Sequence, residues 1–253
     1  MKLVLSTWLD IELWLKQCRT ILIPIGSIEQ HGPNGFLGTD ALCPEVIAHT
    51  AEDGANTDML IGPTFNVGCA QHHLAFPGTI TLRPSTMIAA IEDWTASLAR
   101  HGFERIYWLN GHGGNVATIE AAFAEVHAKR SYDLNGGLSQ PGLTLKLRNW
   151  WDLKGVMKLC NDLYPVGHGS HATPSEVSVT YSAYPEFIPK NAKMTPKIAP
   201  IGVIGDAVQY RAKYPDGRIG SDPSQSTSKD GDKIVGIAAA ALREEFGLFA
   251  TAN

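Results

Sequence analysis

The sequence predicts an α/β fold: a three-layer α/β/α sandwich with a mostly parallel sheet. Short apolar runs typical of buried strands alternate with longer segments whose apolar residues recur at helical spacing. Polar residues and glycines follow directly after the strands, where α/β sheets gather their ligands. The chain has 253 residues and no internal repeat, so we expect a single domain over residues 1–253.

The first third of the chain begins with a helix and continues with two strands. A first helix is predicted over 6–18, where one helical face carries Trp8, Leu9, Leu13, Trp14 and Leu15. The apolar run 21–25 ends at Gly26 and predicts a buried strand. A helix over 43–51 and a short strand over 59–61, closed by a Gly-Pro pair, follow.

The remaining elements keep the same alternation. A strand over 80–82 precedes a helix over 85–102, with Ser85 as a suitable N-cap and Gly102 as a suitable stop. The later predicted elements are a strand over 106–109, a helix over 116–129, a strand over 143–147 and helices over 175–183 and 232–246. The Ser- and Asp-rich stretch 220–231 is interpreted as a surface loop.

Composition and charge exclude several classes of protein. The net charge of −4 comes from mixed signs without a basic run, which argues against a nucleic-acid partner. No apolar run approaches the roughly 20 residues of a membrane span, and the N-terminus does not resemble a signal segment. The four cysteines are too scattered for a zinc knuckle or a disulfide framework. We therefore expect reduced thiols in a cytoplasmic protein.

Three polar clusters carry the candidate chemistry. Glu29 and His31 follow the first strand, and if the chain stays extended their side chains point to the same side. The next nine residues are rich in glycine, and their turn can return Asp40 to the same place. Carboxylate, imidazole and carboxylate are suitable ligands for a divalent ion such as Zn²⁺ or Mn²⁺.

The second cluster, Asn110 to Asn115, lies between a strand and a helix, with His112 among glycines. A dinucleotide-binding GxGxxG turn fails here because Val116 occupies the third glycine position. In the third cluster, His171 lies beside glycines and five residues before Glu176, which suits one proton carrier and one metal ligand. The motifs GxSxG around Ser170 and HExxH are both absent.

The other histidines receive weaker interpretations. His49, His101 and His127 fall within or at the ends of helical patterns and are interpreted as surface or capping residues. The roles of His72 and His73, in the loop over 68–79, stay open.

At these residues the sequence resembles the creatinine amidohydrolase (creatininase) family over most of its length. The stretches that carry the resemblance are Gly26-Ser27-Ile28-Glu29-Gln30-His31-Gly32-Pro33 with Asp40, Phe76-Pro77-Gly78-Thr79-Ile80, Asn110 to Asn115, His171-Ala172 with Glu176 and Ser178, and the closing loop that begins at Gly220. Several long motifs in the family's order make the resemblance specific.

The resemblance implies two divalent metal ions, with zinc expected and manganese or iron as alternatives. Glu29, Asp40 and His112 would hold one ion, and His31, Asp40 and Glu176 the other, with Asp40 as the bridge. In creatininase the second ion's carboxylate comes from a Glu two residues after the loop histidine. Here that position is Gly114, so the resemblance leaves Glu176 to supply the carboxylate.

Some positions depart from the family pattern and bear on the substrate. Asn34 stands where the family often has His, Thr173-Pro174 where it has Gly-Glu, and His72 where Glu is common. Trp150 and Trp151 fall near the place of a substrate-covering aromatic, and His73 is a further candidate substrate contact. These differences argue against assuming creatinine itself.

The resulting prediction is a metal-dependent amidohydrolase acting on a small, cyclic amide, with His171 as catalytic proton donor and Glu176 as ligand and catalytic residue. Alternatives are hydrolysis of a formamide, a peptide terminus or a cyclic ketone or lactone, and a non-catalytic metal- or ligand-binding relative. The resemblance also implies a homo-oligomer, with a hexamer as one possible form. The charged fraction of 18% tolerates such subunit contacts.

Overall fold

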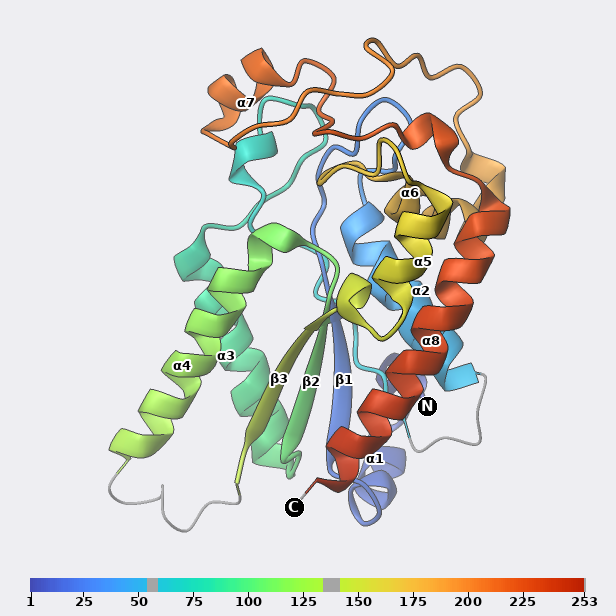
Figure 1. Ribbon diagram of the computed structural model, residues 1–253. Helices are drawn as coiled ribbons and strands as arrows, with labels where there is room; N and C mark the ends of the chain where they lie inside the picture. The colour runs from blue at the N-terminus through green and yellow to red at the C-terminus, as the bar shows by residue number, and fades with distance from the viewer. Residues whose placement is uncertain (54–58, 134–141, 253) are drawn as a thin grey trace.

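The computed structural model describes residues 1–53, 59–133 and 142–252. Within them, three parallel strands form one sheet in the order β1 (Thr20–Ile25), β2 (Arg105–Asn110) and β3 (Thr144–Asn149). Helices cover both faces of this sheet, as Figure 1 shows. The predicted α/β/α layering with a parallel sheet is therefore confirmed.

The helices separate into two layers by the side of the sheet on which they pack. Helices α1 (Trp8–Leu15), α3 (Pro84–His101) and α4 (Val116–Tyr132) lie on one face. Helices α2 (Thr39–Asp53), α5 (Val156–Leu163), α6 (Pro174–Ala183) and α8 (Ser228–Thr251) lie on the other. The short helix α7 (Ala207–Lys213) lies beyond the sheet, against residues 71–73.

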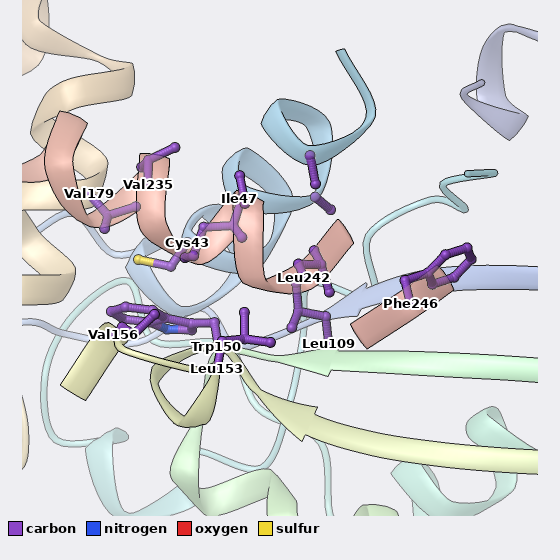
Figure 2. Packing of buried hydrophobic residues seen from close by; sticks show 14 of the residues in the cluster. Cys43, Ile47, Leu109, Trp150, Leu153, Val156, Val179, Val235, Leu242 and Phe246 are labelled. Carbon is purple, nitrogen blue, oxygen red and sulfur yellow. The ribbon is translucent and has the colours of Figure 1, made fainter. Parts of the chain in front are cut away.

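Alternating side chains of the strands fill the two cores. Ile21, Ile23 and Trp108 pack with α3 and α4, while Leu22 and Leu109 pack with α2 and α8. Successive strand residues point to opposite faces, so a continuous apolar run supplies both layers. Figure 2 shows the second core, to which α2 contributes Ile47, α8 contributes Leu242 and β2 contributes Leu109. Trp150 belongs to the same core.

Strand β3 lies at one edge of the sheet and is more polar and more exposed than β1 and β2. On the side facing α8, Lys146 and Arg148 pair with Glu245 at 2.7 and 2.8 Å. On the other side, Leu145 and Leu147 pack against the α3–α4 core. Charged residues along an exposed edge also discourage pairing with a further strand.

Several sequence-based expectations need correction. Residues 59–61 do not form a strand; Ile61 makes isolated bridges to Leu22 and Lys2. The expected strand 80–82 is reduced to one bridge between Ile80 and Ile28, and Arg83, rather than Ser85, is the N-cap of α3. Gly102 does end that helix in the left-handed conformation, with φ of 104°.

The stretch 220–231 is a surface loop only in part. Residues 220–223 are buried against the candidate site, and residues from Ser228 onward begin α8. Helices α5 and α7 were not anticipated. Across the residues described, no helix combines the length and the apolar character that crossing a bilayer would require.

Candidate metal centre

Two glycines allow the first turn of α2 to rest on the carboxyl ends of β1 and β2. A Cβ on Gly26, just after β1, would lie 2.1 Å from the carbonyl oxygen of Asp40. A Cβ on Gly111, just after β2, would lie 1.9 Å from the same oxygen. Neither position has room for a side chain, and this close approach brings Asp40 to the edge where both strands end.

The loop after β2 is held by its two asparagines. The Asn110 side chain accepts from the His112 backbone N–H at 3.1 Å and donates to the His112 carbonyl at 2.7 Å. The Asn115 side chain accepts from the N–H of Cys69 and donates to the carbonyl of Gly26, both at 2.9 Å. These bonds fix His112 above the strand ends.

The five predicted ligands, Glu29, His31, Asp40, His112 and Glu176, come together in the structure. His31 Nε2 lies 2.9 Å from Asp40 Oδ1, and His112 Nδ1 lies 2.8 Å from Asp40 Oδ2. Glu29 Oε2 is 3.3 Å from His112 Nδ1, and Glu176 Oε1 is 3.9 Å from His31 Nε2. The side chains form two groups that share Asp40, each with its ligand atoms within 4.8 Å of one another.

The outer nitrogen of each of these two imidazoles is engaged by a backbone carbonyl. His31 Nδ1 lies 3.1 Å from the carbonyl oxygen of Glu29, and His112 Nε2 lies 3.0 Å from that of Cys69. A carbonyl only accepts, so the outer nitrogens carry the protons and the inner nitrogens face the carboxylates. This arrangement is usual for metal-binding histidines, because the outer bond fixes the ring and its tautomer.

The buried carboxylates lack the hydrogen bonds that their burial requires. Glu29 is 0% exposed, and neither of its carboxylate oxygens accepts a hydrogen bond. Asp40 Oδ2 lacks one as well. Unsatisfied buried carboxylates are costly unless a cation compensates them. The donor set of imidazole nitrogens and carboxylate oxygens therefore fits divalent ions such as zinc or manganese.

Burial and charge shift the pKa values of these groups. Burial raises the pKa of Glu29 to about 8 and that of Glu176 to about 7. Burial opposes the charged form of His31, but the carboxylates of Asp40, Glu176 and Glu29 together outweigh it and raise the pKa to about 10. For His112, burial again opposes the charged form, but Glu29 and Asp40, with the Cys69 carbonyl, together outweigh it and raise the pKa to about 9. Without an ion, protons take its place.

Glu176 reaches the centre from the first turn of α6. In a capping box, the Thr173 backbone N–H donates to Glu176 Oε1 at 2.5 Å, and the Glu176 N–H donates to Thr173 Oγ1 at 3.3 Å. Gly114 has no space for the creatininase carboxylate, since a Cβ there would lie 2.4 Å from His112 Nε2. Geometry thus favours Glu176 as the second carboxylate donor.

His171 lies beside the centre, and its Nδ1 is 3.8 Å from Glu29 Oε1. Its Nε2 is 2.8 Å from both the carbonyl oxygen and the side-chain nitrogen of Gln30. That amide nitrogen already contacts two other acceptors, the Gly217 carbonyl and His73 Nδ1. The carbonyl contact therefore places the proton on Nε2 and leaves Nδ1 free. Burial and the neighbouring His31 lower the pKa of His171.

A cavity of about 320 Å³ opens beside the centre. Its wall includes Asp40, His112, His171 and Glu176, together with Trp150 and Trp151. His73 is 1% exposed and is not among the residues that line this cavity. Instead, His73 lies beside Glu29, and its ring centroid is 4.5 Å from that of His171.

Sequence reasoning assigned no role to His168, which also lines the cavity. Its Nε2 lies 2.8 Å from Ser175 Oγ, and its ring is parallel to that of Tyr164. The signal was its position in the same glycine-rich stretch as His171. By contrast, His101 and His127 are exposed, and His49 is half-buried outside the centre, in agreement with their interpretation.

Comparison with known proteins identifies the family of the chain. The family model described as creatinine amidohydrolase matches residues 5–246. The chain belongs to the creatininase family. A mycofactocin precursor peptide peptidase of Mycolicibacterium smegmatis is 33% identical over 108 residues, covering 41% of this chain and 43% of that protein. The creatinine amidohydrolase of Pseudomonas putida is 25% identical over 181 residues, covering 66% and 65%.

Solved creatininase structures share the fold. A structure described as creatininase Mn superposes with a TM-score of 0.83 at 20% identity and covers 99% of this chain and 98% of that one. A mutant creatininase of Zn-Zn type gives a TM-score of 0.78 at 20% identity, with the same coverage of 99% and 98%.

The chain matches less than two thirds of the length of either sequence relative, the peptide peptidase of Mycolicibacterium smegmatis and the creatinine amidohydrolase of Pseudomonas putida.

Proposed function

We propose that this creatininase-family chain is a metal-dependent hydrolase that cleaves a C–N bond of a small, neutral, cyclic amide. The observation that carries the proposal is the meeting of five ligand side chains, from four separate parts of the chain, beside one cavity that Asp40, His112 and Glu176 line. Glu29, Asp40 and His112 would hold one ion. His31, Asp40 and Glu176 would hold the second, so Asp40 belongs to both sets.

When bound, two divalent ions would lower the pKa of a water molecule and polarise the carbonyl of the substrate. Zinc is the expected metal, and manganese and iron accept the same mixed donors. The names of the two superposed structures, with manganese and with a zinc pair, support a divalent metal. The protein's own groups hold the ligands in place and move the proton.

His171 is the proposed proton carrier. Its free Nδ1 faces the centre, and the proton on Nε2 is held by the Gln30 carbonyl, which orients the ring. Nδ1 accepts a proton from the attacking water and returns it to the amide nitrogen as the C–N bond breaks. General acid–base catalysis of this kind contributes about 10²–10⁴-fold to rate.

The cavity wall supports a neutral substrate. Its residues include two tryptophans, a methionine and small polar side chains, but no lysine or arginine among those described. A carboxylate on the substrate would find no cation there except the metals. A peptide terminus is the second candidate, because a relative is named as a peptidase. Formamides, cyclic ketones and lactones also belong on the test panel.

Elemental analysis and a substrate panel test the proposal together. We expect two divalent ions per chain and turnover of at least one amide. His171→Ala should keep both ions and lose about 10²-fold or more in kcat. His127→Ala, on the exposed face of α4, serves as the control. Protein prepared without chelator that binds no metal, or a His171→Ala variant with full turnover, contradicts the proposal.

The proposal also includes a cellular location and an oligomeric state. The four cysteines are unpaired, as suits a reducing cytoplasm. A homo-oligomer is expected, and sedimentation equilibrium would measure a multiple of the 27.3 kDa chain mass. A single-chain mass at all concentrations would contradict it.

A further inference from the structure

The side chain of Gln30 is held from two sides by backbone groups. Its Oε1 accepts from the Gly32 N–H at 2.9 Å, and its Nε2 donates to the Gly217 carbonyl at 2.9 Å. Turning the amide over would place two donors face to face at Gly32 and two acceptors face to face at Gly217. The backbone therefore fixes which end of this amide is nitrogen.

The orientation of Gln30 determines which nitrogen of His73 carries the proton. Gln30 Nε2 lies 2.9 Å from His73 Nδ1, and an amide nitrogen can only donate. His73 Nδ1 must therefore be the acceptor, which leaves the proton on Nε2. The His73 side chain is 1% exposed, and its Nε2 lies 3.1 Å from Glu29 Oε1 without the alignment of a hydrogen bond.

This tautomer conflicts with a role for His73 as a metal ligand. Glu29, His72 and His73 have ligand atoms within 4.8 Å of one another, so the three could otherwise hold a cation of their own. Ligation through His73 Nε2 would require that nitrogen to be unprotonated. The proton would then sit on Nδ1 and face the amide hydrogens of Gln30.

We propose that Gln30 is a positioning residue that keeps His73 out of the metal shell and holds its protonated Nε2 next to Glu29. The inference rests on the proposed metal centre and adds a specific outer contact to it. It leaves Glu29 Oε2, 3.3 Å from His112 Nδ1, as the oxygen available to an ion. The chain then binds two ions and not a third at His72 and His73.

Nitrogen NMR of the ¹⁵N-labelled protein loaded with ¹¹³Cd²⁺ reads the tautomer and the ligation directly. We expect cadmium coupling at His31 and His112, and none at His73, whose ring pattern should show a neutral imidazole protonated at Nε2. His73→Gln assigns the His73 signals. Coupling at His73, or a proton on its Nδ1, overturns this inference while leaving the metal centre intact. A protein that binds no cadmium overturns the proposed function as well.

Gln30→Glu tests the role of position 30 at nearly constant side-chain volume. A carboxylate accepts where the amide donates, so the His73 proton should move to Nδ1 in this variant. His72→Gln is the matched control and should keep two cadmium ions per chain and the wild-type His73 pattern. If Gln30→Glu leaves the proton on Nε2, or if His72→Gln loses an ion, Gln30 does not have the proposed role.

Chelator competition gives a second measurement that needs no substrate. Removing an outer partner of a ligand typically costs about 10–100-fold in metal affinity. We expect such a loss for both Gln30→Met and His73→Phe, and the double variant should be no weaker than His73→Phe alone. Independent, additive losses would show that Gln30 does not act through His73.

Discussion

The ionisable residues of the centre are held in a state that only a cation or protons can satisfy. Glu29 and Glu176 have raised pKa values because burial penalises their charged forms, whereas His31 and His112 have raised values because carboxylates face them. Near neutral pH the metal-free centre therefore holds protons at the positions that would ligate an ion. Metal binding must release them.

This exchange predicts that metal affinity rises with pH. Protons compete with the ion below the raised pKa values, which lie between about 7 for Glu176 and about 10 for His31. Affinity should therefore increase steadily from about pH 6 to pH 9, as expected for protonatable ligands. Chelator competition across this range, with calorimetry in buffers of different ionisation enthalpy, measures both the affinity and the protons released. An affinity independent of pH would contradict the prediction.

Single substitutions can test whether position 176 or position 114 supplies the carboxylate for the second ion. Glu176→Gln should lose one of the two ions because the second group then lacks its carboxylate. Gly114→Glu should not restore that ion in the double variant, since even a Cβ at position 114 would lie 2.4 Å from His112 Nε2. Metal content by elemental analysis decides the matter. Two ions in Glu176→Gln, or rescue by Gly114→Glu, would show that the assignment is wrong.

At the scale of elements, the site depends on how closely α2 approaches the ends of β1 and β2. The helix begins at Thr39, earlier than the predicted residue 43, so that Asp40 lies in its first turn. The turn from His31 to Asp40 is closed by the Gly35 N–H donating to the His31 carbonyl at 3.0 Å. The predicted return of Asp40 to His31 is thus confirmed.

Two glycines of the same loop should respond differently to alanine. A Cβ on Gly111 would lie 1.9 Å from the Asp40 carbonyl oxygen, whereas a Cβ on Gly113 would meet nothing within 4 Å. Gly111→Ala should destabilise the protein by about 3 kcal/mol or prevent folding, because the opposing atom is backbone. Gly113→Ala should stay within about 0.5 kcal/mol of wild type. Urea unfolding measures both, and equal effects would contradict the close approach.

At the scale of the whole molecule, the centre joins segments that are distant in sequence. Its residues come from the turn after β1, the first turn of α2, the loop after β2 and the first turn of α6. All lie beyond the carboxyl ends of the parallel strands, where α/β sheets place their ligands (Figure 1). An ion bound there connects these segments in the native state alone.

Removal of metal should therefore lower the melting temperature, and more so at higher pH. For Glu29 the folded pKa of about 8 lies above the ordinary value of 4.5, so the metal-free native state holds more protons than the unfolded chain. The stability of the metal-free protein then falls as pH rises from about 4.5 to about 8. The loaded protein binds metal more tightly over the same interval and should be protected. Calorimetric scans with and without chelator should diverge from pH 6 to about pH 9; a constant gap would contradict the linkage.

Much of the fold and the candidate ligands could be predicted from local sequence, because periodicity and glycine placement act over a few residues. Polar residues directly after buried strands are expected at one edge of a parallel sheet, which places Glu29, His31 and His112 together. The glycine-rich turn added Asp40, and the third polar cluster added Glu176. The resemblance to a known family then divided these residues between two ions. The segments 59–61 and 80–82 show the limit, since whether an apolar run becomes a strand depends on partners far along the chain.

Contacts between distant segments decided the rest. The lack of space at Gly114 comes from His112 and Cys69, and the position of His73 beside Glu29 comes from Gln30 and Gly217. Such contacts join groups separated by tens of residues, so no local pattern encodes them. Packing also buried residues 220–223, which their polar composition had placed at the surface. Steric exclusion and hydrogen-bond direction act only once these segments have met.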